Sequence, residues 1–250
     1  DEVMGVAAAT AQFKNRVFVV GAQRTSDVPV RTDGAIWVYI ADNESVFIQP
    51  PVTLKAPFIP EETDLDPQNG RSEWVRAVVI QPGTGNALAV GEREFKDGIN
   101  GTFSRAFAVQ VHPLGDLVGT PWTSKADASL PHDAARSVAV CDDGFMAGGW
   151  TRDEPVDAKP RPMIYWIGAN GSSTQHRPEP QLASTQIQGI ACDKEGKIVS
   201  AGTRTAGSPD AQVFTVLGPF GPRTPYETGV QGDDGAGAVA CDWRGLCGWG

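Results

Sequence analysis

The chain repeats one pattern of apolar and polar positions five times. Each copy has a short apolar run, a turn of Gly, Asn or Asp residues, and a second apolar run, which is typical of a β-hairpin. The copy at 188–204 reads "QGIACDKEGKIVSAGTR". The five copies predict hairpins at 5–24, 74–93, 135–152, 187–204 and 237–250.

A second kind of hairpin follows each of the first four copies. Its apolar runs are bulkier and hold most of the aromatic residues, as in "AIWVYIADNESVFIQPPVTL". The first hairpin (strands A and B) and the second (strands C and D) together make a four-stranded unit. No segment keeps a 3.6-residue apolar period, so we expect almost no helix. The pattern therefore predicts an all-β chain.

Four-stranded repeats of roughly 40–50 residues are typical of β-propeller blades. We predict a β-propeller built from four-stranded antiparallel blades, about four and a half of them in this chain. A β-sandwich is the alternative, but it gives no reason for a repeated turn. The predicted blades are approximately 5–54, 74–123, 135–180, 187–230 and the half-blade 237–250.

The half-blade lacks strands C and D, and an open ring would expose an unpaired blade edge. We therefore expect residues 1–250 to be part of a larger propeller of about six to eight blades. The same polypeptide or a second chain would supply the remainder. A four-blade ring with a dangling fifth hairpin is the alternative.

The stretches "IACDKEGKIVSAG" and "VACDWRG" resemble repeats of the type "VAVDxxGNVYVxG" in exported bacterial β-propeller proteins. Asp193 with Gly196, and Asp242 with Gly245, match the Asp-x-x-Gly turn, whereas the third copy has the shorter "CDDG". The resemblance implies a propeller fold and a secreted or cell-surface bacterial protein. It implies no single activity, because such repeats serve many roles.

The amino-acid composition limits the classes of partner that we expect the protein to bind. The formal net charge is -9, which disfavours nucleic acid, because phosphate attraction needs clustered Lys and Arg. No window approaches about 18 consecutive apolar residues, so we expect no membrane insertion.

The chain has four cysteines, at 141, 192, 241 and 247. No CxxC pair occurs and the three histidines are scattered, so we expect neither a zinc site nor another metal or cofactor. Cys241 and Cys247 flank a turn and would face each other on adjacent strands, which favours a disulfide. Cys141 and Cys192 occupy equivalent places on neighbouring innermost strands and are predicted to pair across blades. The alternative is buried free cysteines.

An arginine closes strand B in each complete copy: Arg24, Arg93, Arg152 and Arg204. In propellers of this kind the loops after strand B usually lie on the ligand-binding face. The four guanidinium groups would then circle one channel mouth and bind a small anionic or protein ligand. The alternative is a structural role in which each pairs with an acid such as Glu94 or Asp153.

Two further stretches carry polar residues that suggest a calcium site or a catalytic site. The segment 61–73 loosely resembles a calcium loop, but a solvated acidic loop fits it better. His132 and Asp133 suggest a catalytic pair, but a loop between blades is the better interpretation because no nucleophile elbow accompanies them. We predict no catalytic residue.

These patterns favour a non-enzymatic ligand-binding or scaffold propeller. One alternative is an enzyme that acts on a polysaccharide or peptide at the channel mouth. A second alternative is a calcium-stabilised adhesive domain of a surface protein.

Overall fold

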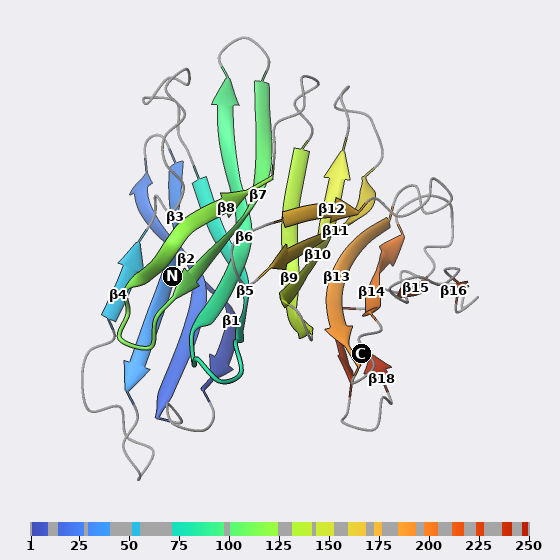
Figure 1. Ribbon diagram of the computed structural model, residues 1–250. Helices are drawn as coiled ribbons and strands as arrows, with labels where there is room; N and C mark the ends of the chain where they lie inside the picture. Colours follow the sequence, from blue (N-terminus) through green and yellow to red (C-terminus); the bar gives the residue numbers. More distant parts are fainter. Residues whose placement is uncertain are drawn as a thin grey trace. The chain divides into compact units, whose positions relative to one another are not determined.

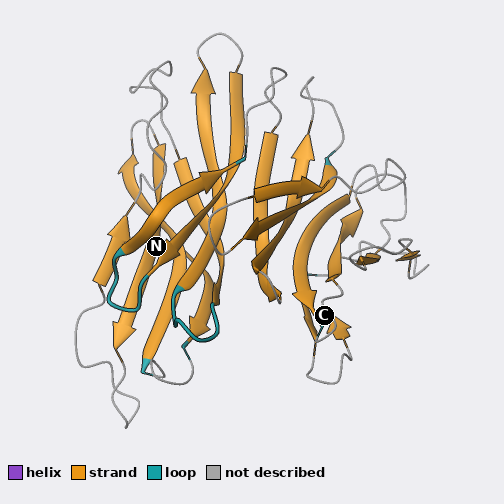
Figure 2. Cartoon of the chain, viewed as in Figure 1, coloured by secondary structure: helices purple, strands orange, loops and turns teal. Residues whose placement is uncertain are grey.

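The structure of the chain is a computed structural model. It describes residues 2–9, 15–27, 30–40, 52–55, 72–97, 101–124, 132–141, 144–152, 160–168, 173–176, 185–193, 198–204, 212–217, 224–227, 237–241 and 247–249. These residues form strands and turns without a helix, as the sequence predicts (Figure 2). The described part of the chain accordingly has no helix long and apolar enough to span a membrane.

The chain divides into two compact units, Asp1–Asp127 and Ala128–Gly250. The first unit holds two four-stranded sheets, sheet 1 and sheet 2 (Figure 1). The strands of sheet 1 are β1 (Glu2–Ala8), β2 (Arg16–Asp27), β3 (Val30–Ile40) and β4 (Val52–Lys55). The strands of sheet 2 are β5 (Ser72–Ile80), β6 (Ala87–Asp97), β7 (Gly101–Val111) and β8 (Leu117–Thr123).

The second unit holds two more four-stranded sheets and one two-stranded hairpin. Sheet 3 consists of β9 (His132–Cys141), β10 (Gly144–Arg152), β11 (Arg161–Gly168) and β12 (Ser173–His176). Sheet 4 consists of β13 (Thr185–Cys192), β14 (Ile198–Arg204), β15 (Gln212–Leu217) and β16 (Thr224–Glu227). The hairpin is formed by β17 (Val239–Cys241) and β18 (Cys247–Trp249).

Every four-stranded sheet is an antiparallel meander in chain order, so the predicted strands A to D are neighbours in space. This confirms the all-β class and the antiparallel four-stranded sheets. The end of strand B differs from the prediction in sheets 1 and 2. Strand B was expected to end at its arginine, but β2 runs on to Asp27 and β6 to Asp97. Both continue because β3 and β7 are equally long and keep pairing with them.

In each unit, the first strand of one sheet packs against the preceding sheet. In the first unit β5 contacts β1, β2 and β3, and in the second unit β13 contacts β9, β10 and β11. The hairpin strand β17 contacts β13 and β14 in the same way. The first strands of successive sheets are therefore neighbours within each unit.

Apolar side chains fill the space between the sheets. The core between sheets 1 and 2 includes Phe18, Val20 and Phe107, all fully buried. The core between sheets 3 and 4 includes Ile164 and Ile190. Burial of such side chains, at about 25 cal/mol per Å² of apolar surface, is the main force that holds each pair of sheets together.

In each four-stranded sheet the first two strands form a β-bulge, where one extra residue of the first strand opposes no residue of the second. The register jumps from Val3 to Gly5 in β1, and from Val75 to Ala77 in β5. Corresponding jumps occur in β9 and β13. The skipped residues, called the bulge residues below, are Met4, Arg76, Arg136 and Gln188.

A glycine on the second strand stands beside each bulge. These bulge glycines are Gly21, Gly91, Gly149 and Gly202. A Cβ atom on any of them would occupy the place of a backbone carbonyl oxygen of the first strand. The bulge brings the first strand this close, so only glycine fits opposite it.

Candidate functional site

The four arginines predicted to form a ring do not share one position in the repeat. Arg24 and Arg152 lie about three residues beyond the bulge glycine of their sheet, whereas Arg93 and Arg204 lie about two residues beyond it. Successive side chains of a strand point to opposite faces of the sheet. Counted from the bulge glycine, the Arg24 and Arg152 side chains therefore point to the opposite face of the sheet from that of Arg93.

The surroundings of the arginines also differ. Arg93 is 2% exposed and forms an ion pair with Glu73, with 3.3 Å between Nη1 and Oε1. Glu73 and Arg93 are directly paired residues of β5 and β6. Arg24 is exposed and Arg152 half-buried, and the side chain of Arg204 lies outside the described residues. The pairing of Arg93 corresponds to the structural alternative, with Glu73 as the acid. The ligand-binding role of the set stays a prediction.

The bulge residues do share one position. Met4, Arg76, Arg136 and Gln188 are all half-buried, and each is left without a direct cross-strand neighbour by the bulge. Bulges re-aim a side chain and are frequent next to binding sites. Sequence reasoning missed this set. A signal was present, because a glycine inside a strand pattern often marks a bulge.

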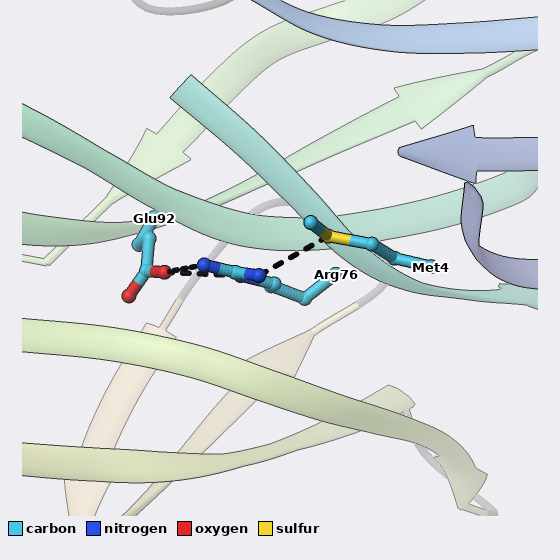
Figure 3. A network of polar contacts seen from close by, with 3 residues as sticks. All are labelled: Met4, Arg76 and Glu92. Atoms are coloured by element: carbon cyan, nitrogen blue, oxygen red, sulfur yellow. Dashed lines mark hydrogen bonds and ion pairs between the residues drawn. The ribbon is translucent and has the colours of Figure 1, made fainter. Parts of the chain in front are cut away.

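Two bulge residues of the first unit touch each other (Figure 3). Nη1 of Arg76 donates a hydrogen bond to Sδ of Met4 over 3.2 Å. Nε of Arg76 donates to Oε1 of Glu92 over 3.0 Å, and Nη2 donates to the same oxygen. The guanidinium carbon lies 5.5 Å from the ring centroid of Trp74, within cation–π range. The cluster therefore joins the first strands of sheets 1 and 2.

Cys141 and Cys192 form a disulfide between β9 and β13, with 5.5 Å between their Cα atoms. The predicted pairing is thus present, but the two positions are not equivalent. Cys141 follows its bulge residue by about five positions and Cys192 by about four, so the side chains point to opposite faces of their own sheets. A bond between two facing sheets requires this offset.

Cys241 and Cys247 are directly opposite each other in the register of β17 and β18. This is the arrangement that the sequence predicts for them. Their disulfide stays a prediction, which the register supports.

His132 and Asp133 were expected in a loop, but they are the first two residues of β9 and are buried, because β9 starts pairing with β10 at this point. Most of the acidic segment, residues 61–71, lies outside the described residues. Among the described residues, no group of three or more His, Cys, Asp or Glu side chains is arranged to hold a metal ion.

No protein-family model matches the chain, and no curated protein matches it in sequence.

Proposed function

We propose that the chain is a propeller-type ligand-binding or scaffold module of an exported bacterial protein. In this proposal the four sheets are consecutive blades and the hairpin of β17 and β18 begins a fifth. Two observations support it: each sheet is a four-stranded meander, and in both units the first strand of one sheet packs beside the first strand of the sheet before it. Innermost strands of adjacent propeller blades have this relation.

The repeated bulge is the observation that carries the binding role. First strands of propeller blades line the central channel, so a residue that bulges from each of them would present its side chain there. The bulge residues offer two guanidinium groups, one amide and one thioether. Guanidinium and amide groups are hydrogen-bond donors, which suits a ligand rich in oxygen acceptors, such as an organic anion or a glycan.

The proposal is tested with the intact protein and a panel of glycans, carboxylates and phosphates. Thermal denaturation and mass spectrometry are read together. A ligand that binds the native state raises the melting temperature and is recovered unchanged. Recovery of a cleaved glycan or peptide would support the enzyme alternative instead. A rise that depends on Ca²⁺ alone would support the adhesive alternative.

The blade arrangement needs its own measurement. Small-angle scattering or electron microscopy of the protein in its native assembly should show a disc with a central channel. Two globular units in variable orientation would contradict the propeller.

A further inference from the structure

The geometry points to Arg76 as the residue that binds a carboxylate group of the ligand, with the Met4 thioether as the group that the carboxylate displaces. This inference rests on the proposed binding function and specifies its chemistry in the first unit. It is drawn from the contacts of Arg76 with Glu92, Trp74 and Met4.

The bulge and the contacts with Glu92 and Trp74 fix the Arg76 side chain in position before a ligand binds. The bulge turns its side chain out of the cross-strand row, since Val75 pairs with Gly91 and Ala77 with Val90. Glu92, whose side chain is 7% exposed, accepts hydrogen bonds from the Nε–H and Nη2–H groups. The ring of Trp74 lies against the guanidinium group. A cation held in place in this way loses little conformational entropy when a ligand binds.

The other edge of the guanidinium group meets only a weak acceptor. Nη1 donates to Sδ of Met4, and thioether sulfur accepts hydrogen bonds weakly. Within the described part of the chain, the contacts with Glu92 and Met4 engage three of the five guanidinium N–H groups. The Arg76 side chain is 21% exposed, so solvent reaches part of it. A carboxylate oxygen is a much stronger acceptor than the sulfur it would replace.

Charge favours a carboxylate over a phosphate. Glu92 neutralises Arg76, so the cluster as a whole carries no net charge, and the full chain carries -9. The Glu92 carboxylate repels a phosphate dianion more strongly than a carboxylate monoanion, and the monoanion can use the two N–H groups of one guanidinium edge. A single such contact corresponds to a Kd on the order of 10 mM, and further contacts of a natural ligand would tighten it.

The test uses the intact protein labelled with ¹³C at its methionine methyl groups. The three methionines give separate signals, and Met4→Leu assigns the Met4 signal. Acetate, glucuronate, glucose and inorganic phosphate are titrated at constant ionic strength. We expect the Met4 signal to shift saturably with acetate and glucuronate only. Met146 and Met163, which lie in sheet 3, should not respond.

Arg76→Lys and Met4→Leu should change the affinity for acetate in opposite directions. Arg76→Lys keeps the charge but loses the forked donor edge, so binding should weaken at least about fivefold. Met4→Leu removes the competing acceptor, so acetate should bind about threefold more tightly in calorimetry. Arg161→Gln is the matched control, an exposed arginine on β11 of sheet 3, and should leave the affinity unchanged. Circular dichroism confirms that each variant is folded.

The outcomes separate this inference from the binding function itself. A Met4 signal that ignores both carboxylates, while a ligand from the wider panel raises the melting temperature, overturns the Arg76 site and leaves the binding function standing. Equal affinity in Arg76→Lys and the parent protein also overturns it. If no compound binds by either method, the site and the binding function both fall.

Discussion

The Cα atom of Gly149 on β10 faces the backbone carbonyl oxygen of Ala134 on β9 so closely that no Cβ atom can stand between them. The bulge at Arg136 produces this approach by drawing the two strands together. The same relation recurs at the bulge glycines of the other three sheets.

Gly149→Ala should therefore destabilise the protein strongly, by about 2–4 kcal/mol, because a backbone has to move to make room for the methyl group. Urea unfolding gives the free energy. Gly83→Ala is the control: Gly83 has a φ of 84° but nothing within 4 Å of its Cβ position, so only backbone strain of about 1 kcal/mol applies. Equal losses for the two variants would contradict the close approach at the bulge.

The sequence allowed the hairpins and their grouping in fours to be predicted, because turn residues and apolar runs are local signals. It did not locate the bulges from periodicity. The first strands have apolar residues at consecutive positions, as at Ala77–Ile80, which hides the one-residue shift in alternation that a bulge causes. The prediction that the four arginines lie on one face depended on where the bulges are. Without the bulge glycine as a reference, Arg24 and Arg93 seem equivalent, although they lie about three and about two residues beyond it. Glu73 could not be predicted as the partner of Arg93, because the pairing depends on the strand register.

The buried ion pair between Arg93 and Glu73 should be essential for stability. Arg93→Met leaves the carboxylate of Glu73 buried without its guanidinium partner, at a cost of about 3–5 kcal/mol in the free energy of unfolding. Arg93→Met combined with Glu73→Gln should recover much of this loss, because neither position of the pair then carries a buried charge. Arg24→Met, at an exposed position, should change stability by less than about 0.5 kcal/mol.

A double-mutant cycle on chemical unfolding measures the coupling. No coupling between Arg93 and Glu73, together with loss of ligand binding in Arg93→Met, would return Arg93 to the ligand-binding role that the sequence suggested for it. Strong coupling with unchanged binding would establish the structural role.

The disulfide between Cys141 and Cys192 should stabilise the second unit substantially. It closes a loop of 51 residues, for which the chain-entropy relation gives about 4 kcal/mol. Replacing both cysteines by Ser should lower the free energy of unfolding by about this amount. A Cys241–Cys247 bond would close a loop of only about six residues, and its removal should cost about 2 kcal/mol. Non-reducing peptide mapping identifies the bonds. A Cys141 peptide that separates from the Cys192 peptide without reduction would contradict the pairing.

Gly189 should control how the hairpin of β17 and β18 is held on sheet 4. A Cβ atom at Gly189 would lie 2.8 Å from the backbone nitrogen of Val239 and 2.9 Å from the Cα atom of Ala238. Both neighbours are backbone atoms, so Gly189→Ala has to push β17 away from β13. On the same face, Ala201 packs against Val239, and this contact should loosen as well.

We expect Gly189→Ala to raise amide hydrogen exchange in β17 by at least about tenfold, which corresponds to about 1.4 kcal/mol of local stability. The strands of sheet 3 should keep their protection, because Gly189 and Ala201 lie on the face of sheet 4 that carries Val239 rather than the core shared with sheet 3. Ala201→Gly is the matched variant: it removes the methyl group that contacts Val239 without forcing the backbones apart, and its effect on β17 should be smaller. If exchange in β17 is already fast in the parent protein, or if Gly189→Ala leaves it unchanged, the hairpin is not docked on sheet 4 through this glycine. In that case the packing of first strand beside first strand would not extend beyond the four-stranded sheets.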